Sequence, residues 1–184
     1  GNTGPDALTV GVPGNNPFII TVGATSDNYT PYNIGDDMLA SFSSSGPTHA
    51  GFIKPEIVAP GAHMQGLVGQ DSFLMQNYGM YGDEYNYFSM SGTSQATAVT
   101  TGIVALMLQE QPDLSPDDVK CRLMATARMA QTDDEELLYS IFRQGAGLVD
   151  AFAAVTSQYK GCANRNICLL YTSPSPRDQE ASRM

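Results

Sequence analysis

Residues 94–109 constrain the fold most, because apolar side chains fall on most faces of a helix drawn through them. A helix that is apolar all round is typical of a protein interior, so we expect this helix to be buried. Pro112 lies just past its predicted end, and a proline residue cannot continue a helix. The apolar members are Ala96, Ala98, Val99, Ile103, Val104, Leu106 and Met107.

Short strands are expected before this helix, where β-branched or apolar runs lie between turn residues. Helices are expected after it, and Ser115 and Pro116 have the residue types of an N-cap and a first helical position. Strands mixed with helices favour an α/β domain. The predicted strands cover residues 18–22, 39–42 and 56–59, with residues 85–90 extended; residues 26–37 and 66–84 are predicted loops, the second with a hairpin; the later helices cover 115–129 and 149–158, with a turn at 145–147.

The composition indicates one globular domain, since 42% of the 184 residues are hydrophobic and 15% are charged. The net charge is −10, and the absence of basic patches argues against a nucleic-acid partner. No apolar run is long enough for a membrane-spanning helix, so no membrane segment is expected.

Three widely spaced cysteines, Cys121, Cys162 and Cys168, form no metal-binding motif. A Cys121–Cys162 disulfide is one alternative, and free thiols are favoured over it.

The candidate chemistry lies in residues 91–96, Ser-Gly-Thr-Ser-Gln-Ala, which open the predicted helix. A serine nucleophile needs an oriented base and donors for the developing oxyanion. A helix N-terminus supplies free N–H groups and the positive end of a dipole. Gly92 allows a tight turn and a close substrate backbone. On these six residues alone, a plain serine N-cap is the favoured interpretation.

A resemblance to the subtilisin-like serine proteases (subtilases, peptidase family S8) changes that interpretation. Gly92-Thr93-Ser94-x-Ala96 resembles the serine motif of the family, and further blocks follow in the order of the family. The likeness extends from Gly1 to about Ala154. It implies a partial subtilisin-like α/β fold, a parallel-sheet three-layer α/β/α core that lacks its N-terminal part. The other matching blocks are residues 1–4, 9–14, 18–24, 40–47 and 54–61.

The resemblance also implies roles for individual residues. Ser94 is the expected nucleophile, and the side chain of Asn2 is the expected oxyanion donor, together with the Ser94 backbone N–H. Gly11, Gly92 and Thr93 are expected to bind substrate, and the Val12–Pro13 bond is a candidate cis peptide. No metal ligand is expected in this chain and no cofactor is assigned, although structural calcium is common in the family. Protein or peptide substrates are the expected partners, and the expected location is outside the cell or in its envelope.

No residue of this chain is assigned as the aspartate or the histidine of the catalytic triad. Subtilases order their triad Asp, His, Ser, and both upstream members precede the oxyanion asparagine, which is residue 2 here. His49 and His63 lie between the asparagine and serine blocks, so we expect them in loops or at the surface. The chain by itself is therefore expected to be inactive. The main alternative is a subtilase-like pseudoprotease that binds or regulates. A relative with an acidic triad, as in sedolisins, is disfavoured by Asn2, and a non-enzymatic α/β module is a distant alternative.

The C-terminal residues 168–184 resemble one reading frame of a transposase adapter used in short-read sequencing. The match spans essentially the whole segment. The alternative is a natural Pro/Ser-rich terminus. We therefore expect residues 1–167 to be the C-terminal portion of a subtilase catalytic domain and residues 168–184 to be a disordered artefact.

Overall fold

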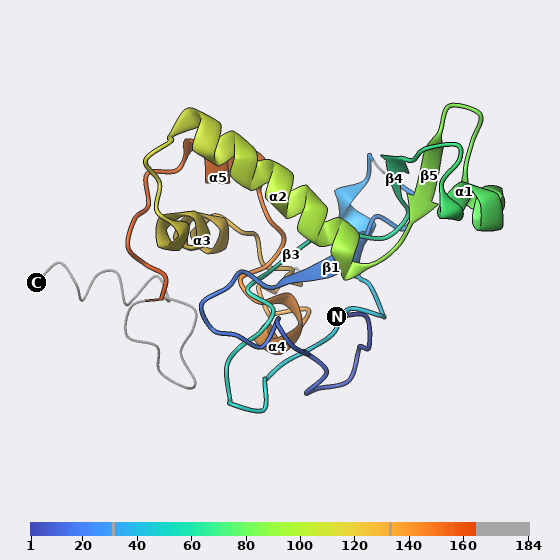
Figure 1. Cartoon of the computed structure of the whole chain (residues 1–184). Helices are drawn as coiled ribbons and strands as arrows, with labels where there is room; N and C mark the ends of the chain where they lie inside the picture. The colour runs from blue at the N-terminus through green and yellow to red at the C-terminus, as the bar shows by residue number, and fades with distance from the viewer. Residues whose placement is uncertain (31, 133, 165–184) are drawn as a thin grey trace, which may run out of the picture.

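The centre of the fold is a three-stranded sheet in the order β2–β1–β3 (Figure 1). The structure is a computed structural model that describes residues 1–30, 32–132 and 134–164. Strand β1 (Val22–Ser26) runs parallel to β3 (Ile57–Pro60), with Val22 opposite Ile57. The two-residue strand β2 (Met38–Leu39) runs antiparallel to β1. The predicted α/β architecture is confirmed, with one antiparallel strand beside the expected parallel pair.

Helices cover this sheet on both sides. The long helix α2 (Thr93–Glu110) contacts β1 and β3 and has α5 (Ala151–Thr156) beside it, whereas α4 (Ile141–Gln144) lies below the sheet in Figure 1. The core joins the inner face of α2 to the sheet and to α3 (Pro116–Ala125). Its fully buried apolar members are Ala24, Ile57, Ala59, Ala96, Met107, Leu123 and Ala154.

The expectation that the long helix is buried on all faces is wrong for this chain. Its buried residues recur at helical spacing on one face, from Thr93 through Ile103 to Met107. On the other side, Leu106 is 53% exposed and Leu108 is 39% exposed. No described residue covers that face. The apolar pattern therefore correctly predicted the helix but not how much of it this chain buries.

The first predicted strand is displaced by four residues. Residues 18–21 form no strand, and β1 begins at Val22, the last residue of the prediction. Gly23 was taken as a terminator, but it lies inside the strand because Val58 and Ser43 pack against its backbone. A Cβ atom there would lie 2.9 Å from Val58 Cγ1 and 3.0 Å from Ser43 Oγ. The glycine thus marks close packing rather than a turn.

Two later helices are shorter than predicted. The cap at Ser115 is confirmed, since its Oγ accepts a hydrogen bond from Asp118 N at 3.2 Å. However, α3 ends at Ala125 rather than near residue 129, because Arg128 pairs with Leu148 in a short antiparallel bridge. Helix α5 covers only Ala151–Thr156 of the predicted residues 149–158. Helix α4 was not predicted.

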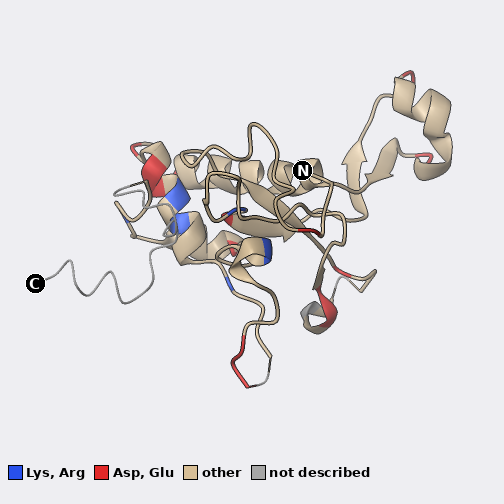
Figure 2. Cartoon of the chain, turned by 90° about the horizontal axis from the view of Figure 1, so that it is seen from below, with Lys and Arg blue, Asp and Glu red and all other residues tan. Residues whose placement is uncertain are grey.

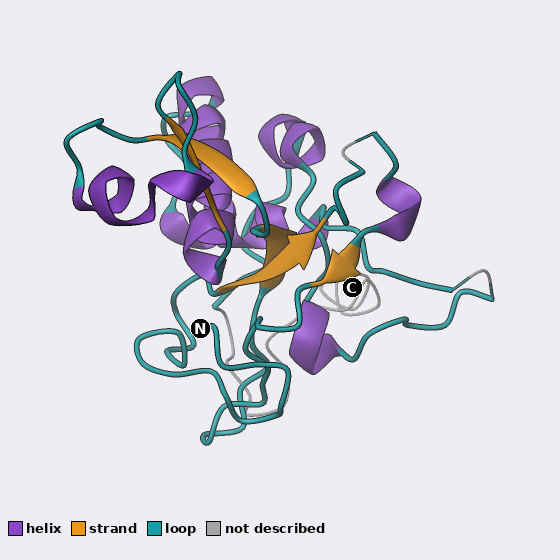
Figure 3. Ribbon diagram, turned by 90° about the vertical axis from the view of Figure 1, so that its right-hand side faces the viewer, coloured by secondary structure: helices purple, strands orange, loops and turns teal. Residues whose placement is uncertain are grey.

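A protruding arm replaces the predicted loop with a hairpin. We use "the arm" for residues 64–90. Strands β4 (Met64–Leu67) and β5 (Tyr87–Met90) pair antiparallel, which confirms the extended segment predicted at residues 85–90 but places the hairpin strands at the two ends of the predicted loop rather than within it. Between them lie α1 (Phe73–Tyr78) and the 3-10 turn η2 (Gly79–Tyr81), which were not predicted. Figures 1 and 3 show the arm extending away from the central sheet, and Figure 2 shows acidic residues near its ends.

The cysteine expectation needs correction. Cys121 on α3 and Cys162 form a disulfide with their Cα atoms 5.1 Å apart, because residues 158–162 return the chain alongside α3. The free thiols favoured from the sequence are therefore wrong for this pair. Cys168 and the adapter-like residues 168–184 lie outside the described residues. Within the described part of the chain, no helix has the length and apolar character needed to cross a membrane.

Candidate active site

Ser94 lies near the N-terminal end of α2, directly after the strand β5 that leads out of the arm. Gly92 forms the turn between them: its N–H donates to Gly61 O at 2.8 Å, and its carbonyl accepts from Gln95 N at 3.1 Å. Gly61 follows β3, so the sheet fixes the turn. Ser94 itself is exposed. Among the described residues, no hydrogen bond occupies the Ser94 backbone N–H. The turn therefore presents a hydroxyl and a free N–H at the positive end of an 18-residue helix.

Asn2 contacts the serine turn, which lies 91 positions later in the sequence. Asn2 Oδ1 accepts hydrogen bonds from Thr93 N and from Thr93 Oγ1, both at 2.9 Å. This pairing fixes the orientation of the side-chain amide, because only its oxygen can accept. The Nδ2 group is then left as a donor. It would lie 3.3 Å from a Cβ atom at Gly92, so any larger residue there would crowd the amide.

The segment that carries Asn2 is held against residues 42–44. Gly4 N donates to Phe42 O at 2.9 Å, and Ser44 N donates to Gly1 O at 3.0 Å. A Cβ atom at Gly4 would overlap the backbone of Ser43, so glycine is required for this approach. Backbone bonds on both sides of Asn2 therefore set its register, and the side chain reaches Thr93 from a fixed position.

The wall segment, our name for residues 9–21, lies below α2 in Figure 1, whereas the arm extends to the upper right. Thr9 anchors it, since its N–H donates to Ser45 O at 3.0 Å and its Oγ1 accepts from Ser45 N at 2.9 Å. Gly11 is exposed, with nothing within 4 Å of a Cβ atom built on it. No contact among the described residues joins Gly11 to Ser94. The Val12–Pro13 bond is cis, as predicted.

The structure places both histidines away from the role of a base. His49 is an exposed turn residue. His63 stacks on Tyr29 with ring centroids 3.8 Å apart, and its backbone N–H donates to Ser91 Oγ at 2.9 Å. No hydrogen bond between described residues joins either imidazole to Ser94. The described residues therefore place an exposed serine hydroxyl next to a free backbone N–H without a histidine bonded to it.

A cavity beside the serine turn was not anticipated from the sequence. It has a volume of about 480 Å³ and lies between the arm, His63 and Gln95, the residue after Ser94. The aromatic residues of the predicted loop were the only signal for it. Its arm side is lined by Leu74, Tyr78, Tyr81, Phe88, Ser89 and Met90.

The described part of the chain contains no candidate metal site, because no three His, Cys, Asp or Glu residues gather around one point there. Asp37 lies close to two other acidic residues, Asp36 and Asp27. Burial raises the pKa of its carboxyl group, and the charges of Asp36 and Asp27 raise it further. The three carboxylates do not gather around one point among the described residues, so no calcium site is assigned to them.

Comparison with known proteins identifies the family of this chain. A family model described as the subtilase family matches residues 1–147. The chain belongs to the subtilase family. Serine protease AprX of Bacillus subtilis (strain 168) is 43% identical over 160 residues, which are 86% of this chain and 34% of the relative. The C5a peptidase of Streptococcus pyogenes is 33% identical over 61% of this chain and 9% of the relative.

Solved subtilase structures share the fold. Fervidolysin from Fervidobacterium pennivorans, a keratinolytic enzyme related to subtilisin, superimposes with a TM-score of 0.59 at 27% identity. That match covers 79% of this chain and 20% of fervidolysin. MycP1 with its N-terminal propeptide removed gives a TM-score of 0.53 at 27% identity, over 80% of this chain and 39% of MycP1. The partial subtilisin-like α/β fold is confirmed, and this chain spans about a third of the length of AprX.

Proposed function

We propose that the protein containing this chain is a serine endopeptidase in which Ser94 is the nucleophile. The observation that carries the proposal is the pairing of Asn2 Oδ1 with Thr93, which leaves Asn2 Nδ2 free to donate. Asn2 Nδ2 and the unoccupied Ser94 N–H face a common point, since a Cβ atom at Gly92 would lie 3.3 Å from the first and 3.8 Å from Ser94 N. Two N–H donors that converge next to an exposed serine hydroxyl are what acyl transfer requires. The base and its orienting acid are expected from histidine and aspartate residues outside this chain.

The reaction follows from these positions. Ser94 Oγ attacks the scissile carbonyl and gives its proton to the base, and the carbonyl oxygen becomes an oxyanion. Asn2 Nδ2 and Ser94 N donate to that oxygen, and the end of the α2 dipole adds to the stabilisation. Collapse expels the amine, which takes the proton from the base. Water, activated by the same base, then releases the acyl group from Ser94.

The remaining parts of the proposal concern surroundings and boundaries. Gly11, Gly92 and Thr93 are proposed to contact peptide substrates, with Gly11 in the wall of the pocket for the side chain before the cleaved bond. The disulfide supports a location outside the cell or in its envelope, because such bonds persist in oxidising compartments. Residues 168–184 are proposed to be foreign to the natural protein.

Peptide hydrolysis by the complete gene product tests the proposal. We expect turnover in the wild type, none above background in Ser94→Ala, and none in residues 1–167 expressed alone, since triad members act as a unit. Ser89→Ala, which changes a serine of the neighbouring strand β5, serves as the matched control and retains activity. Absence of turnover in a folded complete protein would favour the pseudoprotease, whereas turnover in Ser94→Ala would contradict the assignment of the nucleophile.

A further inference from the structure

Two buried lysines hold the backbone of the wall segment. Lys120 Nζ, on α3, donates to Pro17 O at 2.6 Å and to Ile19 O at 3.1 Å. Lys54 Nζ donates to the same Ile19 carbonyl at 3.1 Å. Lys54 is 0% exposed and Lys120 is 3% exposed. Fully desolvated ammonium groups are rare, and they require partners on every side.

Glu56 supplies the opposite charge for both ammonium groups. Its Oε1 atom pairs with Lys54 Nζ and lies 2.9 Å from Lys120 Nζ. Its Oε2 atom accepts from Thr21 N at 2.7 Å. Burial lowers the pKa of Lys54, and the charge of Glu56 opposes that shift. Removal of one member would leave an uncompensated buried charge, so the three residues act together.

The cluster connects to the surface part of the wall through Thr21. Thr21 Oγ1 donates to Gly14 O at 2.7 Å. The next residue, Asn15, donates its backbone N–H to Gly11 O at 3.1 Å. These hydrogen bonds therefore connect Thr21 through residues 14 and 15 to Gly11, the proposed pocket residue.

Residues 161–164, which we call the clip, fasten the same wall from the far end of the sequence. Asn164 Oδ1 accepts from Lys120 Nζ at 3.1 Å, and Asn164 Nδ2 donates to Phe18 O at 3.3 Å and to Asp117 Oδ1 at 2.6 Å. Gly161 N donates to Asp118 Oδ1 at 2.9 Å. The clip therefore bridges α3 and the wall segment directly.

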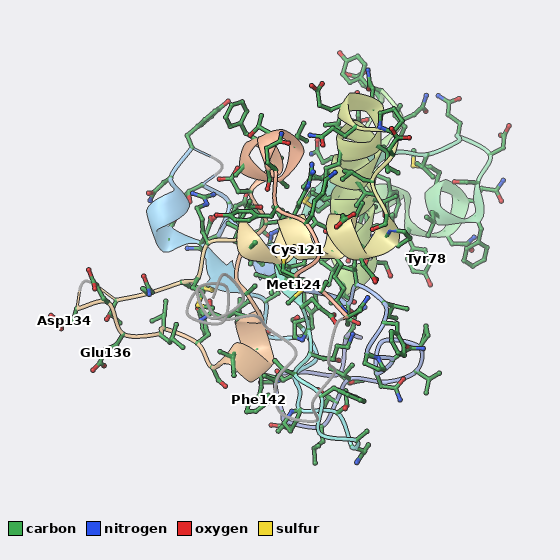
Figure 4. The ribbon with its side chains drawn as sticks, turned by 90° about the vertical axis from the view of Figure 1, so that its left-hand side faces the viewer. Tyr78, Cys121, Met124, Asp134, Glu136 and Phe142 are labelled. Atoms are coloured by element: carbon green, nitrogen blue, oxygen red, sulfur yellow. A yellow bond between two sulfur atoms is a disulfide. The ribbon has the colours of Figure 1, made fainter. Side chains whose placement is uncertain are left out.

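The disulfide makes the clip part of α3. Cys162 lies within the clip, and Cys121 follows Lys120 on α3. Figure 4 shows Cys121 on α3, well separated from Tyr78 in the arm. The covalent bond thus fixes the clip at the position where Asn164 meets both Lys120 and the wall, remote from the cavity next to the arm.

We propose that Asn164 and Lys120, held together by the Cys121–Cys162 disulfide, are positioning residues for the specificity pocket, so that reduction of this disulfide loosens the wall segment. The inference rests on the proposed function for its catalytic consequence. The reductant is a dithiol: one thiolate attacks a sulfur of the pair, and its second thiol then releases the mixed disulfide. The products are the Cys121 and Cys162 thiols and the oxidised cyclic dithiol.

Two readouts in the complete gene product test this inference. The first is hydrogen exchange of the backbone amides of residues 9–21, which is independent of activity. We expect faster exchange, most clearly at the Thr21 amide, in Asn164→Ala, in the double variant Cys121→Ser/Cys162→Ser, and in wild type treated with dithiothreitol. Gln158→Ala is the matched control, because its side chain is exposed and its one hydrogen bond among the described residues goes to Thr156 O.

The second readout separates positioning from general damage. For peptide substrates we expect KM to rise about 10-fold, the effect of losing one or two hydrogen bonds. Selectivity for the side chain before the cleaved bond should fall, while kcat changes less. Labelling of Ser94 by a small fluorophosphonate that does not reach the pocket should stay within about 2-fold, since about 2-fold corresponds to less than one net hydrogen bond.

The outcomes distinguish the claims. Unchanged exchange over residues 9–21 in all three altered forms would overturn the positioning role. Faster exchange accompanied by an equal loss of labelling would also overturn it, because the effect would then be general unfolding. Faster exchange in a protein whose wild type neither labels nor cleaves peptides would uphold the clip and contradict the proposed function instead.

Discussion

The wall segment and the arm are held in the fold in different ways. Residues 9–21 contain no strand or helix and are fastened by partners far away in the sequence, such as Ser45, Glu56 and Lys120. The arm is fastened mainly to itself, through the β4–β5 pairing and the edge contact of Tyr81 with Phe88. The wall thus depends on the whole domain, whereas the arm is a local unit.

This difference predicts where changes are tolerated. Bonds that cross the domain couple the position of a segment to the core, so their loss should affect both folding and catalysis. Contacts within a hairpin can be lost by local opening, with little effect on global stability. The arm exposes Phe73, Met80 and Tyr85 at 69%, 84% and 69%, and their removal should leave the core intact.

The largest effect is expected for Asn2→Ala in the complete protein. Loss of its Nδ2 donor should lower kcat by about 10²–10³, the magnitude known for an asparagine donor in subtilisin of the same family. KM should change little, because the donor acts in the transition state. Steady-state kinetics check this, with Asn77→Ala in the arm as the control. A fall of less than about 5-fold, roughly one weak hydrogen bond, would remove Asn2 from the oxyanion site.

A glycine pair compares the core next to the sheet with the arm in stability. In Gly61→Ala, the new Cβ would lie 2.8 Å from Ala24 Cβ and 2.9 Å from Gly92 O. Overpacking there should cost about 1–3 kcal/mol of unfolding free energy and displace the serine turn. Gly79→Ala has nothing within 4 Å of its Cβ and should stay within about 0.5 kcal/mol. Denaturant unfolding of both variants would decide, and equal losses would refute the contrast.

Helix caps provide a smaller test. Ser115→Ala removes the acceptor for Asp118 N on α3 and should cost about 1 kcal/mol of global stability. The Ser115 hydroxyl also lowers the pKa of Asp118. A carboxyl group with a lowered pKa adds stability above its ordinary range and loses it as the pH falls. The cost of Ser115→Ala should therefore be larger at neutral pH than below about pH 3, as thermal melts would show.

The arm cap is the counterpart of that variant. Ser72→Ala removes the acceptor for Met75 N at 3.3 Å. We expect faster hydrogen exchange within α1 and an unchanged global melting temperature, because the arm opens locally. A global loss equal to that of Ser115→Ala would show that the arm is coupled to the core.

The smallest effects are expected for exposed aromatic residues of the arm. Phe73→Ser and Tyr85→Ser should each change the unfolding free energy by no more than about 0.5 kcal/mol, since these side chains bury little surface. Phe88→Ala, at 4% exposure, is the contrasting variant in the same arm. Its loss should disrupt the hairpin, which circular dichroism and exchange would report.

Local patterns in the sequence predicted features that depend on few residues. The cap at Ser115, the extended segment ending at Met90 and the turn around Gly145 follow from neighbouring residue types, and the structure confirms them. The start of β1 was missed, because Gly23 is explained by the distant Val58 and Ser43 rather than by its neighbours. Elements fixed by tertiary contact leave little trace in adjacent residues.

The candidate site shows the same limit. Ser94 and Asn2 were predicted from blocks resembling a family, and nothing local indicates that Asn2 Oδ1 meets Thr93 across 91 positions. The disulfide was weighed and disfavoured, since spacing alone does not reveal that Cys121 and Cys162 lie side by side. The clip likewise depends on partners up to 146 positions apart.

The central claim is that Ser94 is the nucleophile of the complete protein, with its base supplied from outside this chain. Mapping the adduct of a fluorophosphonate probe by peptide mass spectrometry tests it most directly. The account predicts rapid modification of Ser94 in the complete protein, none in Ser94→Ala, and slow modification in residues 1–167 alone. An adduct on another serine, or equally rapid labelling of the isolated residues 1–167, would contradict it.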